Sequence, residues 1–103
     1  MGSLNFEDVE IPVDDRALAH LQVVILSRLR RGEAFAFSWR GADDEAAGRA
    51  TVWLHPHAKI VFSYIDGDAQ GINRHWVDAL TEASFSSGGL HLVPEPEAPA
   101  RRR

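Results

Sequence analysis

The segment from residue 14 to residue 31 carries the most constraining pattern in this sequence, a stripe of apolar residues at helical spacing. Its members recur three or four positions apart, which places them on one side of an α-helix; they are Leu18, Leu21, Ile25 and Leu29. Asp14 or Asp15 can cap the first turn, because a short carboxylate accepts hydrogen bonds from the free N–H groups there. Gly32 is a natural stop, since glycine readily takes the left-handed conformation that ends many helices. We therefore predict a helix that must bury this stripe elsewhere in the chain.

A second, shorter stripe predicts another helix over residues 72–84. The apolar residues that form it are Ile72, Trp76, Ala79, Leu80 and Ala83. Alternating apolar and polar residues predict β-strands, with a hairpin possible around Glu7 and Asp8 in the first of them; the predicted strands are 4–13, 33–40, 49–55, 58–65 and the short 90–93. The segments 41–48 and 66–71 are rich in glycine and acidic residues and are expected to be loops.

The predicted elements follow one another in the order β-α-β-β-β-α-β. Two amphipathic helices over a mostly antiparallel sheet form a two-layer α+β sandwich. We expect residues 1–93 to form one domain, because 103 residues leave room for no more. Residues 94–103 are expected to be a disordered tail, since three prolines prevent a strand from continuing there.

Composition excludes several classes of protein. The chain has no cysteine, so disulfides and thiolate chemistry are excluded, and a reducing cytoplasm is the expected location. Neither a signal peptide nor an apolar run of membrane-spanning length is present. The formal net charge of -4 argues against a general nucleic-acid binder. A local basic patch remains open, because Arg16, Arg28, Arg30 and Arg31 fall in one segment.

The candidate catalytic and metal motifs are weak. His55 and His57 could face one side of a strand and hold a metal, but Pro56 interrupts them and no third ligand is evident. Residues 66–71 begin like a calcium loop, but its twelfth position is Val77 instead of a carboxylate. There is no phosphate-binding glycine loop and no serine in a nucleophile-elbow motif. We therefore expect no metal, no cofactor and no enzymatic activity.

Several phrases of the sequence resemble those of a small, uncharacterised family of actinobacterial proteins about as long as this chain. The phrases include Asp14–Ile25, Leu29–Glu33, Phe37-Ser38-Trp39, Trp53–Pro56, Asn73–Trp76 and Gly89–Pro96. Members of that family are often labelled ATP-dependent DNA ligase. The resemblance implies no established activity, cofactor or catalytic residue.

The residues themselves test the ligase label. Such ligases form a covalent lysine adenylate within a Lys-x-Asp-Gly motif, whereas the Asp66-Gly67 pair here is preceded by Tyr64 at the lysine position. The single lysine, Lys59, lies too far along the chain to replace it. We expect no ligase catalysis, and keep as the alternative function an accessory or remnant domain of ligase or DNA-repair chemistry.

The polar side of the first helix is a candidate interaction surface. Arg16, His20, Ser27 and Arg31 share one face, opposite the apolar stripe. This face is either simply solvated or a docking surface for a phosphate backbone or an acidic partner. Val23 lies away from the stripe, so either the helix is buried on two sides or a second chain covers Val23.

The sheet offers a second candidate surface. If the helices cover Phe35, Phe37 and Trp39, the far side carries small alanines together with Thr51, Trp53 and His55. Packing of a second copy against this side is a simpler explanation than the stacking of Trp53 on a nucleic-acid base. At the start of the second helix we expect Trp76 in the core, Asn73 as a cap and Arg74 beside Asp78, with a ligand clamp as the alternative.

These observations lead to one hypothesis about function. We expect a small, non-enzymatic interaction module, a homodimer that binds protein or nucleic acid through its surface. The candidate surface residues are Arg16, His20, Val23, Arg31, Trp53, His55 and Arg74.

Overall fold

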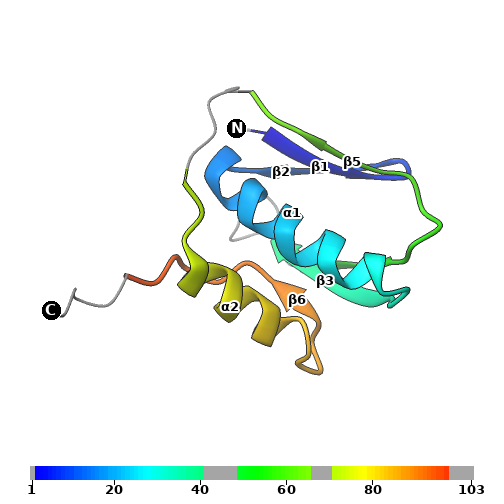
Figure 1. Ribbon diagram of the computed structural model, residues 1–103. Coiled ribbons are helices and arrows are strands. Elements are labelled where there is room, and N and C mark those ends of the chain that lie inside the picture. Colours follow the sequence, from blue (N-terminus) through cyan, green and yellow to red (C-terminus); the bar gives the residue numbers. More distant parts are fainter. Residues whose placement is uncertain (1, 41–48, 66–70, 98–103) are drawn as a thin grey trace, which may run out of the picture.

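The protein has an α+β fold with two helices and two small, mostly antiparallel sheets (Figure 1). A computed structural model describes residues 2–40, 49–65 and 71–97. The elements in chain order are β1 (Gly2–Phe6), β2 (Val9–Val13), α1 (Asp15–Arg30), β3 (Phe35–Arg40), β4 (Arg49–Leu54), β5 (Ile60–Ser63), α2 (Arg74–Ala83) and β6 (Leu90–His91).

The first sheet has the strand order β2-β1-β5 and is antiparallel throughout. Glu7 and Asp8 form the turn between β1 and β2, so the predicted hairpin is present, with Glu7 at a φ of 54°. Leu4 lies opposite both Ile11 and Phe62. Because cross-strand partners share a face, these side chains form the inner surface of this sheet.

The second sheet has the strand order β4-β3-β6. β3 pairs with β4 in antiparallel fashion and with β6 in parallel. Phe37 is opposite Val52 and beside Leu90 on the inner face, whereas Ala36 is opposite Trp53 on the outer face. Alternation along β3 therefore separates a core face from an exposed one, as the sequence predicts.

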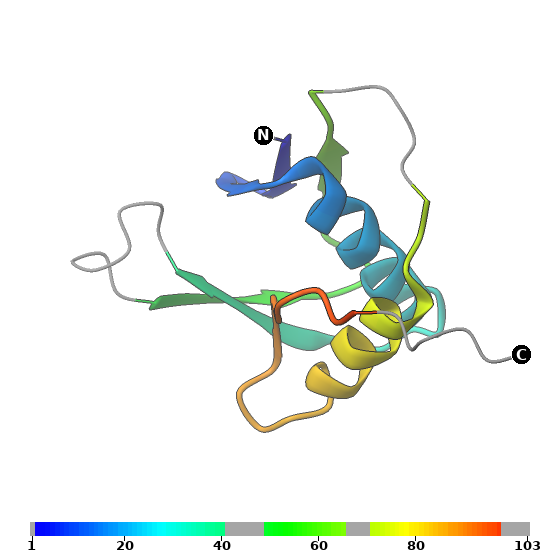
Figure 2. The same cartoon turned by 90° about the vertical axis from the view of Figure 1, so that its left-hand side faces the viewer.

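Helix α1 packs on β1 of the first sheet, α2 packs on β6 of the second, and the two helices pack on each other (Figure 2). The core draws on every layer and is almost free of solvent. Its fully buried apolar residues include Leu4, Ile11, Leu18, Leu21, Ile25, Leu54, Leu80 and Leu90. One continuous core thus joins both sheets through the helices.

The helix ends follow their local sequence. The Asp14 carboxylate accepts hydrogen bonds from the N–H groups of Arg16 at 3.1 Å and Ala17 at 3.3 Å. After α1, Gly32 has a φ of 78° and donates its N–H to the Leu29 carbonyl. Asn73 caps α2 in the same way as Asp14 caps α1. Local capping chemistry was sufficient to place these boundaries.

The structure also adds what periodicity did not show. The strands divide into two sheets of three because β5 pairs with β1, across more than fifty residues of chain, instead of continuing beside β4. A turn closed by the hydrogen bond from the Ala58 N–H to the His55 carbonyl separates β4 from β5. Alternation identifies a strand and its faces, but it carries no information about the strand that becomes its neighbour.

Candidate functional site

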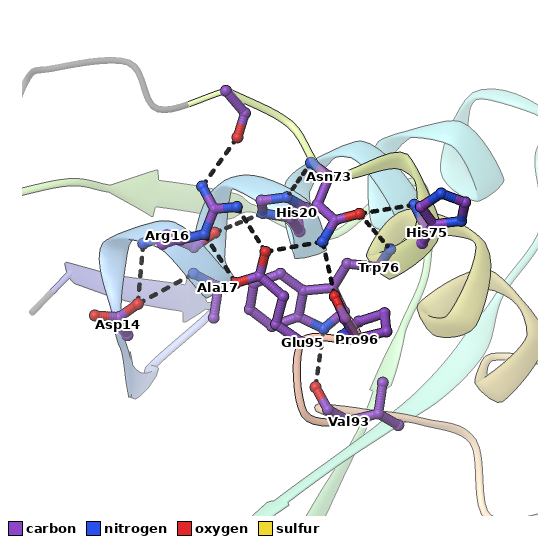
Figure 3. Close-up of polar contacts among 11 residues, drawn as sticks. Asp14, Arg16, Ala17, His20, Asn73, His75, Trp76, Val93, Glu95 and Pro96 are labelled. Atoms are coloured by element: carbon purple, nitrogen blue, oxygen red, sulfur yellow. Dashed lines mark hydrogen bonds and ion pairs between the residues drawn. The ribbon is translucent and has the colours of Figure 1, made fainter. Parts of the chain in front are cut away.

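The first turn of α1, the N-terminus of α2 and the segment after β6 meet at one polar junction (Figure 3). Arg16 holds the Glu95 carboxylate with two hydrogen bonds, Nε to Oε1 at 2.9 Å and Nη2 to Oε2 at 2.6 Å. Its remaining nitrogen, Nη1, donates to the Gly71 carbonyl at 3.0 Å. Asn73 Nδ2 donates to Glu95 Oε2 at 2.9 Å and to the Pro96 carbonyl at 3.0 Å. A fork-like pair of this kind fixes direction as well as charge.

These contacts change the acidity of Glu95. The hydrogen bond from Arg16, followed by that from Asn73, lowers the pKa of Glu95 to about 2. The same pairing raises the pKa of Arg16. Glu95 is therefore ionised throughout the physiological pH range, and Arg16 is neutralised within its own chain. Residues 94–97 were expected to begin a disordered tail, but Glu95 and Pro96 have specific partners, whereas residues 98–103 lie outside the described residues.

His20 lies beneath this junction and is fully buried, so it is not part of an exposed face as the helical projection suggested. Its ring packs on Trp76 with centroids 4.5 Å apart. His20 Nε2 accepts the Asn73 backbone N–H at 2.8 Å, so Nδ1 carries the proton and donates to the Arg16 carbonyl at 2.7 Å. Helix α2 covers this side of α1, which is why a polar position in the helical pattern is buried.

Arg28 does not contribute to an exposed basic patch, because it is buried. Its side chain reaches across to the end of α2, where Nη1 donates to the carbonyl and the hydroxyl of Ser84. Its Nε donates to Glu33 at 2.8 Å, and its guanidinium stacks over Phe35 and Phe85. Arg31 approaches the other oxygen of Glu33 at 3.3 Å. Hydrogen bonding to Arg28 is the first cause, and to Arg31 a further cause, of the lowered pKa of Glu33.

Val23 is 42% exposed and lies on the side of α1 that faces Tyr64. Tyr64 lies beside it and donates its hydroxyl hydrogen to Gln22 Oε1 at 2.5 Å. Both residues line a shallow hollow of about 540 Å³, and its wall also includes Leu26 and Arg30. Helix α1 is packed against both β1 and α2, and Val23 is nevertheless exposed; its cover by a second chain stays a prediction.

The outer face of the second sheet carries an exposed tryptophan, Trp53. Trp53 is 59% exposed and lies opposite Ala36, whose small side chain leaves the indole uncovered. Next to this pair, Thr51 Oγ1 and Ser38 Oγ are hydrogen-bonded at 2.8 Å. In the described part of the chain no strand pairs with the outer edge of β4.

The other two predicted surface residues lie apart from Trp53. His55 turns toward the first sheet, where its ring meets Phe6 edge-on at 6.1 Å, so it does not share the outer face. Arg74 is exposed at the start of α2, and Asp78 is exposed one turn later. The seven predicted residues consequently form no single surface; Trp53, Val23 and Arg74 are exposed on three different elements.

A cleft of about 490 Å³ opens between β2 and the strands β3 and β6. Apolar side chains form most of its wall, including Ile11, Leu21, Phe37 and Trp39, with Asp14 and His91 among its polar residues. The rings of Phe37 and Trp39 are stacked 6.1 Å apart on the same face of β3. Sequence analysis did not identify this cleft, because its two sides belong to different sheets.

The sequence motifs considered for metal or nucleotide chemistry lie only partly within the described residues. Within residues 2–40, 49–65 and 71–97, no group of three or more His, Asp or Glu side chains could hold a metal ion. Lys59 is exposed in the turn before β5, and Asp66 to Gln70 lie outside the described residues. Neither of the two described helices has the length and apolar surface that crossing a membrane requires.

A family model described as a domain of unknown function, DUF7882, matches residues 1–95. The chain belongs to the DUF7882 family. The matched region of this DUF7882 domain includes Arg16, Asn73 and Glu95, so the polar junction lies within it except for Pro96. No curated protein and no solved structure matches the chain.

Glu95 is the member of the junction that sequence analysis missed. It lies between Pro94 and Pro96, and prolines at this density predict a disordered tail. The same prolines restrict the backbone before it meets its partners, which lowers the entropy lost on binding. A single acidic residue between two prolines is the sequence signal that could have identified this contact.

Proposed function

We propose that this DUF7882 protein is a small, non-enzymatic interaction module that forms a homodimer through β4. The observation that carries this proposal is the exposure of Trp53, 59%, on a strand whose outer edge is unpaired in the described residues. An edge strand presents free N–H and C=O groups, and it invites pairing unless charges, proline or a bulge protect it. The central residues of β4, Ala50 to Trp53, contain neither charge nor proline.

A second copy fits this edge because antiparallel pairing of β4 with itself is self-complementary. Two-fold symmetry would bring the same backbone groups together from both chains and join two three-stranded sheets into one. The indoles of the two Trp53 residues would then lie on one continuous outer face. Contact between these side chains across the new strand pair would remove part of their aromatic surface from solvent, which favours association.

A nucleic-acid partner is less favoured than protein. Arg16 is paired with Glu95, while Arg28 and Arg31 share the carboxylate of Glu33, so three of the four arginines of the basic segment form ion pairs within the chain. Binding to a phosphate backbone needs free cationic groups. We place the module in the cytoplasm, because a chain without cysteine is typical of a reducing compartment.

Analytical ultracentrifugation of the wild type and two variants tests the dimer. We expect the wild type to sediment as a dimer and Trp53→Lys as a monomer, because a lysine on an edge strand disfavours its pairing with another strand. Val61→Lys is a matched control, since Val61 is 43% exposed on β5, an edge strand of the other sheet. It should remain dimeric. A wild type that stays monomeric at its highest soluble concentration refutes the proposal, as does a Trp53→Lys variant that remains dimeric.

A further inference from the structure

Three side chains, from Arg16, Asn73 and Trp76, hold the segment after β6. Trp76 Nε1 donates to the Val93 carbonyl at 2.9 Å, Asn73 Nδ2 donates to the Pro96 carbonyl at 3.0 Å, and Arg16 binds the carboxylate of Glu95 (Figure 3). We call Arg16, Asn73 and Trp76 the cradle, and residues 93–96 the segment. The segment comes from a part of the chain 79 residues away from Arg16.

Donors and acceptors are divided cleanly between the two sides. In these contacts every donor belongs to the cradle, and the segment supplies only carbonyl and carboxylate oxygens. A proline residue has no backbone N–H and loses nothing in such a contact. The site therefore suits a proline-containing stretch with one acidic side chain.

The cradle is itself held rigidly from below. Asn73 Oδ1 accepts the N–H groups of His75 and Trp76, and its backbone N–H is bound by His20. His20 in turn packs on the Trp76 ring. Because Oδ1 of Asn73 accepts both capping N–H groups, the side-chain amide is held in the orientation that points Nδ2 at the segment. A preorganised donor set loses little entropy on binding.

We propose that the cradle is a binding site for a proline-rich segment of another protein that carries a glutamate between prolines, and that residues 93–96 occupy it in cis as a competing ligand. Aromatic side chains that donate to the carbonyls of stiff, proline-rich segments are a recurrent mode of peptide recognition. The bound Val93 to Pro96 stretch shows directly which chemistry fits. The cis segment benefits from a high effective concentration, so a partner must displace it.

The partner is defined by this complementarity. Arg16 selects a carboxylate, and Asn73 and Trp76 select two main-chain carbonyls on either side of it. A lysine or arginine at the glutamate position would face the Arg16 guanidinium and be rejected by charge. The inference does not rest on the dimer at β4, since Trp53 belongs to β4 whereas the cradle residues belong to α1 and to the start of α2.

A synthetic peptide with the sequence of residues 92–97 tests the proposal on the full-length chain. In Glu95→Lys the cis segment is repelled, and we expect the peptide to bind saturably, with a midpoint of about 0.1 mM, tenfold below the millimolar effective concentration of a cis segment. Wild-type protein should need at least about tenfold more peptide, because its own segment competes. Amide chemical shifts around Asn73 and the Trp76 indole N–H signal report the binding.

Four controls make the result specific. A peptide with glutamine in place of its central glutamate should bind at least about tenfold more weakly, as should Glu95→Lys that also carries Arg16→Gln. Glu97→Gln, an exposed position next to the segment, should behave as the wild type. Trp53→Lys should bind the peptide as the wild type does, which separates this site from the dimer.

The proposal is overturned if folded Glu95→Lys shows no saturable peptide binding at concentrations ten times the expected midpoint. It is also overturned if the glutamine peptide binds equally well, since the contact with Arg16 would then carry no recognition. If Glu95→Lys fails to fold, Glu95→Gln is measured with the same peptides. Exchange of segments 93–96 between two copies, seen as a dimer that Glu95→Lys abolishes, would assign the cradle to a second copy and refute the heterologous partner.

Discussion

Arg28 of α1 and Ser84, the C-cap residue of α2, are joined by two hydrogen bonds of 2.9 Å from a single guanidinium nitrogen. The cation lies at the C-terminal end of α2, where the free carbonyl groups favour positive charge. The guanidinium carbon of Arg28 lies over the rings of Phe35 and Phe85, 4.7 and 4.2 Å from their centroids. A residue that belongs to an arginine-rich stretch in the sequence is thus a buried link between the two helices.

Arg28→Lys should destabilise the fold even though it keeps the charge. Lysine cannot donate from a planar fork to Glu33 and Ser84 at once, nor stack between two rings in the same way. We expect a loss of about 1–3 kcal/mol in the free energy of unfolding, measured by urea denaturation. The exposed Arg30→Lys on the same turn is the matched control and should change stability by less than about 0.5 kcal/mol. Equal effects of the two substitutions would contradict this role for Arg28.

His20→Phe should also be destabilising, although it preserves an aromatic ring against Trp76. The substitution removes the acceptor of the Asn73 N–H, which is then left without its partner in a partly buried position. We expect a cost of about 1–3 kcal/mol in the free energy of unfolding. His75→Phe, at an exposed position of α2, should be close to neutral. A neutral His20→Phe would show that ring stacking alone accounts for the role of His20.

The pairing of Glu95 should make stability depend on pH. Its pKa is about 2 in the folded protein, below the usual value of 4.5, so the unfolded state takes up the proton first as the pH falls. The stabilisation by Glu95 is therefore complete above pH 4.5 and lost between pH 4.5 and 2. Wild type and Glu95→Gln should differ in their urea midpoints at pH 7 and converge toward pH 2. Glu97→Gln should match the wild type throughout, and a difference between wild type and Glu95→Gln that stays constant with pH would rule out this assignment.

Gly89→Ala should destabilise the connection into β6. Gly89 has a φ of 85°, and a Cβ placed there would lie 2.7 Å from the Ala36 carbonyl oxygen and 2.8 Å from the Ala36 Cβ. Backbone strain and this clash together should cost more than about 1 kcal/mol. Gly88→Ala provides the adjacent control, because a Cβ there meets nothing within 4 Å. Thermal denaturation that fails to separate the two variants would contradict the close approach of Gly89 to β3.

Local chemistry in the sequence was sufficient for the elements themselves. The caps at Asp14 and Gly32, the turn at Glu7 and Asp8, and the alternation of β3 all depend on residues close in the chain, and the structure has each of them. The fold class follows from the same information, because amphipathic helices and alternating strands must bury their apolar sides together. Trp76 and Asn73 also have the core and capping positions that their spacing indicated.

Tertiary structure alone decided which polar residues remained available at the surface. Periodicity places His20 and Arg28 on particular sides of α1, but it cannot show that α2, more than forty residues later in the chain, covers them. Nor can it show that Glu95 returns to Arg16 or that β5 pairs with β1. Helical and strand patterns are properties of neighbours along the chain, whereas burial and ion pairing depend on which distant segment arrives. For that reason the elements could be derived from the sequence, and the cradle, the cleft and the exposed face of β4 required the folded chain.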